Sequence, residues 1–281
     1  PADDRPPRSP LVLDSANRLY LARYWVYERE VARELVRRSK VTFEVDEAAL
    51  EAAIVESFGP IPGDDATAEA GPDLQRVAAA VAATRSLCVL SGGPGTGKTS
   101  TVVRILAVLS RLRLARGEEP LRIRLAAPTG KAAARMKESV EKARGALPEE
   151  LRAPIPDQAV TIHRLLGWRS GSIYFRHDEE RKLPYDVLVV DEASMVDLPL
   201  MAKILRALPR EARLVLVGDK DQLASVEAGS VLGDLCSDDS PDAPRAGGSR
   251  VGLRFSAEAR ARYGRLAGQV LPDADTEESG N

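Results

Sequence analysis

The chain has 281 residues and few or none of several sequence features, and each absence excludes a class of protein. Its two cysteines, Cys88 and Cys236, cannot build a disulfide framework, which predicts a reducing, cytoplasmic setting. Both stand next to apolar residues and are expected to be small core residues rather than reactive thiols. No apolar run approaches the roughly 20 residues of a membrane span, and no signal peptide is visible, so no membrane partner is expected.

Aromatic residues and net charge are also scarce. Aromatics make up 4% of the chain, so the core must consist mainly of valine, leucine, isoleucine and alanine. A formal net charge of −2 gives no global basic field of the kind that indicates nucleic-acid binding, although a local groove can still be basic. The overall composition is that of an ordinary globular protein.

Apolar runs alternate with helical patterns through the middle of the chain. The runs LCVL, VLVV and LVLVG are almost continuously apolar, as strands covered on both faces are. Strands that alternate with helices favour an α/β fold with a parallel sheet and helices on both faces. Asp73 is expected to cap the first helix of this part, DLQRVAAAVAA.

Flanking patterns divide the chain further. RLYLARYW alternates as a strand does, whereas helical spacing runs from about Tyr27 to Arg38 and again over DEAALEAAIVESF. GPIPGDDATAEAGPD is typical of a linker. We therefore predict a small, mainly helical N-terminal domain over residues 1–60, a linker over 61–72 and an α/β domain over 73–236. Residues 237–281 are expected to hold a polar disordered loop, one helix and an acidic tail.

The stretch SGGPGTGKTST matches G-x-x-x-x-G-K-[ST], the pattern of a phosphate-binding P-loop. Glycines let backbone N–H groups turn inward, and the following helix directs its positive end at the phosphates. Lys98 is predicted to reach the β- and γ-phosphates, and Thr99 to offer its hydroxyl to Mg²⁺. The predicted nucleotide-binding residues here are Gly92, Gly93, Pro94, Gly95, Thr96, Gly97, Lys98, Thr99 and Ser100.

Two further strand ends complete the predicted site. VLVVDEAS places Asp191 and Glu192 at the carboxyl end of a buried strand, where Asp191 would hold Mg²⁺ and Glu192 would polarise the attacking water. Gln222, just past the next strand, could touch the γ-phosphate. A signalling GTPase would need an Asn-Lys-x-Asp segment, which is absent, and a small-molecule kinase would not need the acidic pair. The pattern favours nucleotide hydrolysis coupled to motion.

Five segments in order carry a wider resemblance: LSGGPGTGKTST, LAAPTGKAAARM, TIHRLLG, VLVVDEASMVD and LVGDKDQLASVEAGSVLGDL. Together they closely resemble the RecD-like helicases of superfamily 1, the family of the RecD subunit (exodeoxyribonuclease V alpha subunit) of bacterial RecBCD enzymes. The resemblance covers about residues 73–235. LVLDSANRLYLARYWVYE also resembles the N-terminal region of the family, which docks on partner subunits.

The resemblance implies a P-loop NTPase fold of RecA-like type, with ATP and Mg²⁺ as cofactors. It implies 5′ to 3′ movement on single-stranded DNA at a duplex end, in double-strand break repair and recombination, with RecB-like and RecC-like subunits as partners. In the family's motifs, Lys98 and Thr99 match motif I, Asp191 and Glu192 match motif II, and Gln222 matches the motif III glutamine.

The resemblance also implies base and DNA contacts. Gln75, in the helix before the P-loop strand, is placed like the family's adenine-reading glutamine. Two segments after strands would hold DNA phosphates, and backbone contacts of this kind carry no sequence information, which suits a translocase. Trp168 could stack on a base, with core packing as the alternative. The implied DNA-binding residues are Pro128, Thr129, Gly130, Thr161 and His163.

The chain departs from the family in one respect. Family motors have two RecA-like domains, and the second supplies an arginine to the nucleotide, whereas Arg254, Arg260 and Arg262 here lack a strand context. We therefore expect a fragment with only the first motor domain, which binds Mg-ATP weakly and hydrolyses it poorly. Two alternatives stay open: a stand-alone RecD-like helicase that works without RecB and RecC, and a P-loop module that binds nucleotide without turnover.

Overall fold

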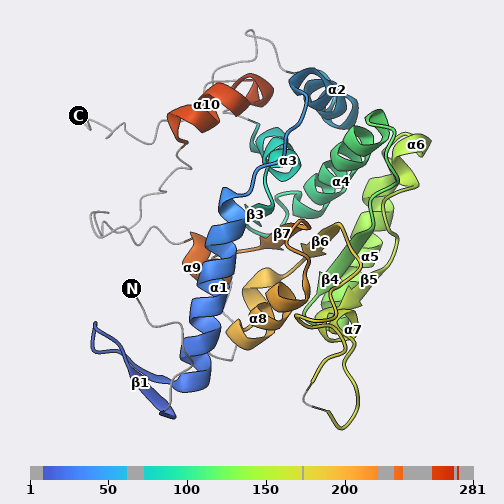
Figure 1. Cartoon of the computed structure of the whole chain (residues 1–281). Coiled ribbons are helices and arrows are strands. Elements are labelled where there is room, and N and C mark those ends of the chain that lie inside the picture. The colour runs from blue at the N-terminus through green and yellow to red at the C-terminus, as the bar shows by residue number, and fades with distance from the viewer. Residues whose placement is uncertain are drawn as a thin grey trace.

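The computed structural model of the chain describes residues 9–61, 73–172, 174–220, 231–236, 255–268 and 271. Its centre is a five-stranded sheet in the order β3-β7-β6-β4-β5, in which every neighbouring pair is parallel (Figure 1). The predicted α/β fold with a parallel sheet is thereby confirmed. The strands are β3 (Leu87–Ser91), β4 (Ile123–Ala127), β5 (Ala159–Thr161), β6 (Val187–Val190) and β7 (Arg213–Gly218).

Two of the continuously apolar runs form the inner strands β6 and β7, where both faces of the sheet are covered, and the third forms the edge strand β3. All four residues of β6 are buried. Val187 and Val189 pack into one hydrophobic core, whereas Leu188 and Val190 pack into the other, as the alternation of side chains along a strand requires. The sheet therefore separates two cores, one on each face.

Helices cover the two faces in two groups, as predicted. The first group comprises α2 (Glu47–Phe58), α3 (Leu74–Thr84), α4 (Lys98–Ala115), α5 (Gly130–Gly145), α6 (Glu149–Arg152) and α10 (Ala257–Tyr263). The second comprises α1 (Ala22–Lys40), α7 (Ile162–Leu166), α8 (Leu198–Ala207) and α9 (Val231–Cys236). Single-turn 3₁₀ helices are η2 (Ala193–Met195) and η3 (Arg265–Ala267).

The N-terminal segment begins with a hairpin of β1 (Leu11–Leu13) and β2 (Leu19–Leu21), and α1 follows it without a loop. The predicted helix start near Tyr27 was wrong, because α1 begins at Ala22. The alternation of RLYLARYW is compatible with a strand. However, the Arg29 guanidinium lies 4.5 Å from the centre of the Trp25 ring, one helical turn away, and this pair stabilises the helix.

Helices α1 and α2 pack on opposite faces of the sheet. Val31 and Leu35 of α1 enter the core beside α8, and Leu50 and Ile54 of α2 enter the core beside α4. Residues 1–8, most of the predicted linker, the predicted disordered loop and the acidic tail lie outside the described residues.

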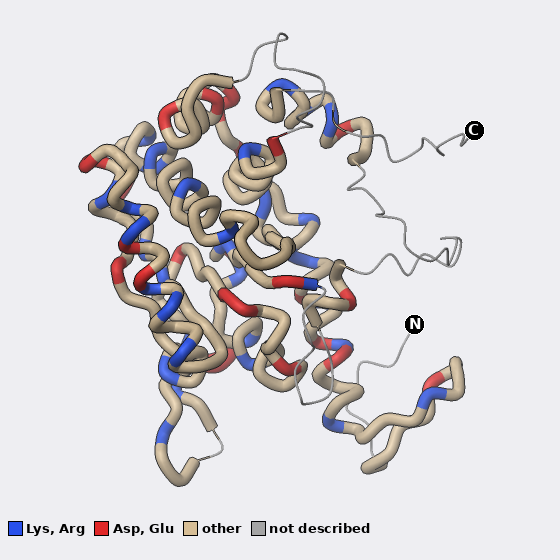
Figure 2. Tube along the Cα trace, turned by 180° about the vertical axis from the view of Figure 1, so that it is seen from behind, with Lys and Arg blue, Asp and Glu red and all other residues tan. Residues whose placement is uncertain are grey.

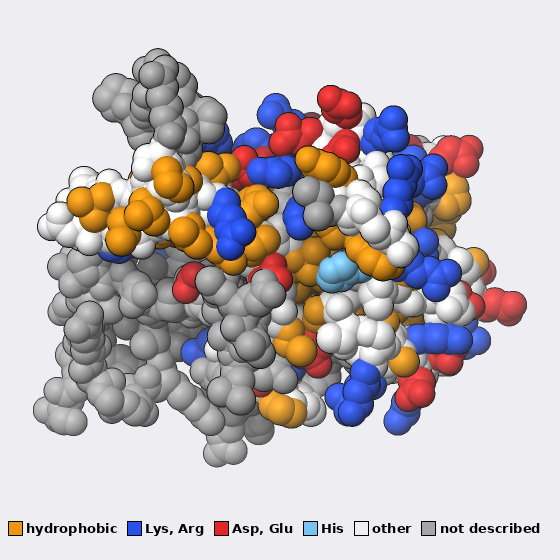
Figure 3. Space-filling model, turned by 90° about the horizontal axis from the view of Figure 1, so that it is seen from below, with side chains coloured by type: hydrophobic (Ala, Val, Ile, Leu, Met, Phe, Trp, Pro, Cys, Tyr) orange, Lys and Arg blue, Asp and Glu red, His pale blue; other side chains and the backbone are white. Residues whose placement is uncertain are grey.

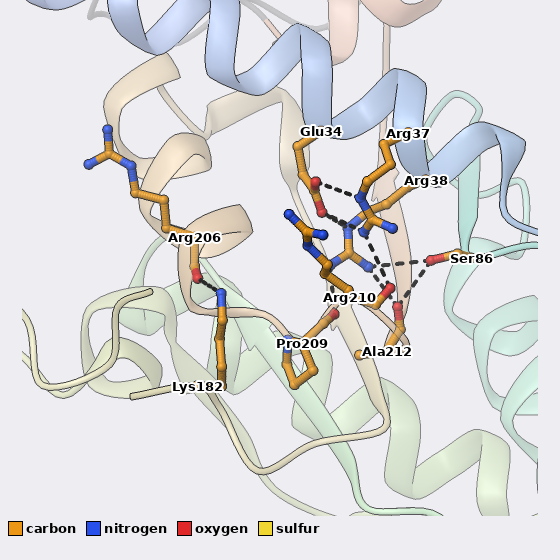
Figure 4. Close-up of polar contacts among 9 residues, drawn as sticks. All are labelled: Glu34, Arg37, Arg38, Ser86, Lys182, Arg206, Pro209, Arg210 and Ala212. Carbon is orange, nitrogen blue, oxygen red and sulfur yellow. Dashed lines mark hydrogen bonds and ion pairs between the residues drawn. The ribbon is translucent and has the colours of Figure 1, made fainter. Parts of the chain in front are cut away.

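A buried arginine joins α1 to the sheet. Arg38 has 0% exposure, and its guanidinium donates to the carbonyls of Ala212 at 2.6 Å and Pro209 at 2.7 Å and to Ser86 Oγ at 3.4 Å (Figure 4). Glu34 accepts from Arg38 Nε at 2.9 Å. Because Ser86 precedes β3 and Ala212 precedes β7, one side chain holds the helix to the starts of two strands.

Charge is mixed over the molecule. In the view of Figure 2, acidic and basic segments are interspersed along the described chain, in keeping with the net charge of −2. Opposite charges also pair between helices, since Glu30 of α1 forms an ion pair with Arg206 of α8. Among the described residues, the longest helices carry too many polar side chains for any of them to span a membrane.

Candidate nucleotide and DNA site

The predicted P-loop connects β3 to α4 at the carboxyl edge of the sheet. Gly95 and Gly97 have φ angles of 77° and 81°, in the left-handed region that glycine adopts without a steric penalty. A Cβ added at Gly92 would lie 2.9 Å from Thr96 Oγ1, which itself donates to the Gly93 carbonyl at 2.9 Å. The loop therefore requires glycine at these positions, as a loop that presents backbone N–H groups must.

Lys98 begins α4 and folds back over the loop. Its Nζ donates to the carbonyls of Gly92 at 2.6 Å and Gly93 at 2.8 Å, so the ammonium lies against the loop. Thr99 and Ser100 follow in the first helical turn and are half-buried. The lysine, the hydroxyls and the positive helix end thus meet at one place.

The acidic pair follows β6 at the same edge. Asp191 N donates to the Ala126 carbonyl at 2.9 Å, and Glu192 N donates to Asp191 Oδ1 at 3.0 Å. Glu192 has φ 51°, an unusual backbone conformation for a residue with a side chain. Strain of this kind concentrates at functional positions, where the surrounding structure holds it in place.

The surroundings of Asp191 place Lys98 within electrostatic reach. Burial raises the pKa of the Asp191 carboxyl, the hydrogen bond from Glu192 N–H lowers this pKa, the Glu192 charge raises it, and the Lys98 charge lowers it. The strand order, in which β7 alone separates β3 from β6, likewise places this carboxylate and the P-loop lysine at one edge of the sheet.

The donor set suits Mg²⁺. Among the described residues there is no group of three or more histidine, cysteine or acidic side chains that could enclose a metal ion. Mg²⁺ is instead commonly held by one or two protein oxygens together with water and phosphate oxygens. The Thr99 hydroxyl and the Asp191 carboxylate offer oxygens of that kind beside the P-loop, so the residues present fit this ion.

Strand order brings the ends of β3 and β6 to either side of β7. Gly92 N donates to the Gly218 carbonyl at 3.2 Å, and Lys220 N donates to Ser91 Oγ at 3.2 Å, which ties the end of β7 to the start of the P-loop. Gln222 lies just beyond and outside the described residues, so its predicted role stays a prediction.

Gln75 lies beside the P-loop. It is half-buried in the first turn of α3, and a Cβ added at Gly97 would lie 3.5 Å from Gln75 Nε2. Asp73 caps this helix as predicted, because its carboxylate accepts from Gln75 N at 3.0 Å and from Arg76 N at 3.2 Å. The side chain that was expected to read a base is thus next to the loop that was expected to hold phosphate.

The two predicted DNA segments lie together on the other half of the sheet edge. Ala127 at the end of β4 pairs with Thr161 at the end of β5, so the segments that follow these strands are neighbours. Thr129 Oγ1 accepts from Ala132 N at 3.1 Å, and Thr161 Oγ1 accepts from Arg164 N at 3.2 Å, so both threonines cap helices. The remaining predicted members are Pro128, which is half-buried, and Gly130 and His163, which are exposed.

Sequence reasoning missed the strand that positions Thr161. β5 has three residues, too short to give a period, and the Ala159 to Thr161 run was not assigned to any element. The core-packing alternative for Trp168 was wrong, because 56% of its surface is exposed and Tyr174 nearby is 75% exposed. A bridge between Trp168 and Phe175 holds this pair of chain segments together.

The remaining predictions concern cysteine and arginine. Cys88 is buried, and burial raises the pKa of its thiol to about 12, which confirms an inert core residue. Cys236 is half-buried, with a pKa that burial raises and that Ser91 and Lys220 lower. Arg260 and Arg262 lie on α10, whereas Arg254 lies outside the described residues.

Comparison with known proteins bears on the family of the chain. A family model described as AAA domain matches residues 75–228. The RecBCD enzyme subunit RecD of Mycobacterium tuberculosis (strain CDC 1551 / Oshkosh) is 47% identical over 220 residues, which is 77% of this chain and 35% of that protein. The same subunit of Mycolicibacterium smegmatis is 48% identical over 219 residues, 77% of this chain and 37% of that protein.

A third relative has a different name. The ATP-dependent RecD2 DNA helicase of Deinococcus radiodurans is 42% identical over 146 residues, which is 52% of this chain and 17% of that protein. The chain thus spans about a third or less of the length of these relatives. The resemblance inferred from the motifs is confirmed by the similarity to RecD subunits, and the chain belongs to the AAA domain family.

Proposed function

We propose that this chain carries the first motor domain of a RecD-like DNA helicase that hydrolyses Mg-ATP and moves 5′ to 3′ along single-stranded DNA. One observation carries the hydrolytic part: the P-loop after β3 and the Asp191–Glu192 pair after β6 lie on either side of the end of β7, at one edge of the sheet. Lys98 would neutralise the phosphates, Thr99 and Asp191 would hold Mg²⁺, and Glu192 would polarise the attacking water. Mg²⁺ bound there would draw charge from the phosphate oxygens.

The DNA part rests on the neighbouring half of the sheet edge. The turns after β4 and β5 lie side by side and begin helices whose N–H groups can bind a phosphate. Pro128, Thr129 and Gly130 would take one phosphate of the strand, and Thr161 and His163 another. Contacts of this kind do not read sequence, as movement along DNA requires.

Nucleotide and DNA would thus occupy adjacent parts of one edge. β6, which Asp191 follows, is the direct neighbour of β4, which ends before Pro128. If hydrolysis moves the end of β6, this movement would therefore pass to the DNA segments through the pairing of β6 with β4. This proximity supports coupling between the two proposed sites.

The hairpin supports a docking surface for partner subunits. Leu11 pairs with Leu21 and Leu13 with Leu19, so these four leucines share one face. They are 47% to 66% exposed, and the hydrophobic side chains over the hairpin gather at the left of Figure 3. An apolar face of this kind on a two-stranded ribbon is a usual mark of an interaction site. RecB-like and RecC-like subunits are the proposed partners, in a RecBCD-type enzyme that acts at double-strand breaks.

Replacing Lys98 by alanine tests the nucleotide site. We expect the affinity of the chain for Mg-ATP to fall about 10- to 100-fold, because a charge-assisted contact to phosphate is worth about 1.5–3 kcal/mol. Isothermal titration calorimetry measures the change. Lys142→Ala, an exposed lysine of α5, is the matched control and should bind as the unaltered chain does. Equal affinities for all three chains would contradict the proposal.

Replacing Leu13 and Leu19 together by serine tests the docking surface. Because this cross-strand pair is exposed, we expect the circular dichroism spectrum to be retained while co-purification with RecB and RecC homologues is lost. Leu114→Ser, at a leucine that is 44% exposed on α4, is the control. Retained co-purification of the double variant would exclude the hairpin as the docking surface. No co-purification with the unaltered chain would favour the stand-alone helicase instead, the alternative to which the RecD2 relative corresponds.

A nucleotide-binding module without turnover is the non-enzymatic alternative. The acidic pair beside Lys98 speaks against it, because nucleotide binding alone needs no second carboxylate to act on water. Single-turnover hydrolysis distinguishes this module from a domain that hydrolyses ATP.

A further inference from the structure

The side chain next to Gln75 joins three distant parts of the chain. Arg76 is 4% exposed, although arginine is rarely buried without full hydrogen bonding. Its Nη1 donates to the Gly59 carbonyl at 3.0 Å, and its Nη2 donates to the carbonyls of Pro60 at 2.8 Å and Phe58 at 3.3 Å. The guanidinium thereby satisfies the carbonyls at the end of α2, which a helix leaves without partners.

The same guanidinium holds the start of α3. Arg76 Nε donates to Asp73 Oδ2 at 2.9 Å, while the other oxygen of Asp73 accepts from Gln75 N and Arg76 N. Asp73 N in turn donates to the Ala267 carbonyl at 3.0 Å, in η3. The end of α2, the start of α3 and η3 therefore meet around one ion pair.

An aromatic ring completes the cluster. Phe58, the last residue of α2, contacts two guanidinium groups, with the Arg76 group 5.8 Å and the Arg104 group 5.1 Å from its ring centre. Arg104 belongs to α4, the helix that the P-loop starts. The cluster thus spans the helix that carries Gln75 and the helix that carries Lys98.

These contacts fix Gln75 relative to the P-loop. Gln75 is the residue before Arg76, and its amide lies close to Gly97, so a small rotation of the first turn of α3 would move this amide away from the loop. A hydrogen-bonded arginine fork with four acceptors in place resists such a rotation, because several bonds would have to lengthen together.

We propose that Arg76 is a positioning residue for base recognition: by joining the end of α2 to the first turn of α3, it holds the Gln75 amide where it meets the base of a bound nucleotide. The inference rests on the proposed function, because it adds the base contact predicted for Gln75 to the phosphate contacts proposed for the P-loop. It makes the N-terminal segment a structural part of the base side of the nucleotide site. Adenine, with an amino donor and a ring nitrogen acceptor on one edge, fits a side-chain amide that offers both groups.

The test separates base recognition from phosphate binding. Dissociation constants of Mg-ATP, Mg-GTP and Mg-tripolyphosphate are measured by calorimetry for the unaltered chain and for Gln75→Ala, Arg76→Met and Arg76→Lys. Arg104→Met is the matched control, because this arginine contacts the same Phe58 ring but makes none of the carbonyl bonds. Tripolyphosphate reports on the P-loop alone and shows whether a variant keeps its fold.

We expect Arg76→Met to lower the preference for ATP over GTP about tenfold, as Gln75→Ala does, with tripolyphosphate affinity unchanged. Arg76→Lys should restore part of the preference, since an ammonium can meet some of the four acceptors. The double variant Gln75→Ala with Arg76→Met should lose no more than either single variant, because both act on one contact. Arg104→Met should retain the preference.

Three results would overturn the inference and leave the proposed function standing. The first is equal affinity of the unaltered chain for ATP and GTP. The second is a full preference for ATP in the Arg76→Met variant. The third is a loss of tripolyphosphate affinity in the Arg76→Met variant that is as large as its loss of ATP affinity. An unaltered chain that binds none of the three ligands would contradict the proposed function itself.

Discussion

Replacing Arg38 by alanine should lower the free energy of unfolding by about 3–5 kcal/mol, the usual cost of removing one partner from a buried ionic contact. The substitution leaves the carbonyls of Ala212 and Pro209 without their buried donor and leaves half-buried Glu34 with one arginine fewer. Urea denaturation followed by circular dichroism measures the change, with the slope of the transition as a check on two-state behaviour.

Arg37 supplies the matched control for this experiment. It lies next to Arg38 on α1 and also pairs with Glu34, at 2.7 Å, but its side chain is 29% exposed. Arg37→Ala should cost less than about 1 kcal/mol, because water replaces the lost contacts of an exposed ion pair. If both substitutions cost the same, Arg38 does not join the helix to the sheet in the way that Figure 4 indicates.

Replacing Glu192 by glutamine should slow ATP hydrolysis by about 10²- to 10⁴-fold while Mg-ATP affinity stays the same. The amide retains the size of the side chain but cannot take a proton from water, whereas Lys98, Thr99 and Asp191 are unchanged. Single-turnover hydrolysis with the chain in excess over ATP measures the rate, and calorimetry measures the affinity.

The control for Glu192→Gln is the same change at an acidic residue outside the site. Glu138 is exposed on α5, and Glu138→Gln should hydrolyse ATP at the rate of the unaltered chain. A Glu192→Gln variant with an unchanged rate would remove this carboxylate from the mechanism. A variant that also lost affinity would show that Glu192 holds the nucleotide or the ion instead.

The strands β3, β6 and β7 and the P-loop could be predicted because their signals are local. The apolar runs that became β3, β6 and β7 need cover on both faces, and a single fold class provides it. The glycines at positions 95 and 97 adopt the left-handed φ angles that the motif requires. The capping role of Asp73 could also be predicted, because it depends only on the residues that follow it in the sequence.

The contacts that join distant segments could not be predicted. In the sequence, Arg38 and Arg76 are typical of residues on the exposed face of a helix. In the structure each is buried and donates hydrogen bonds to carbonyls of other segments of the chain. Only the packing of α1 and α2 on the sheet shows which arginines these are. The short strand β5 was missed for a similar reason, since its partner β4 and not its own three residues defines it.

The Arg38 contact also has a consequence for how the protein is made. Arg38 and Ala212 are 174 residues apart, so the ribosome adds the acceptors about 10–35 s after the donor at a usual rate of about 5–20 residues per second. During most of that interval α1 can form with its Glu34–Arg38 pair, but α8 and the carbonyls of Pro209 and Ala212 have not yet been made. Helix α1 is therefore synthesised well before the chain next to β7 that its arginine binds, and it reaches these native contacts only after that segment has been made.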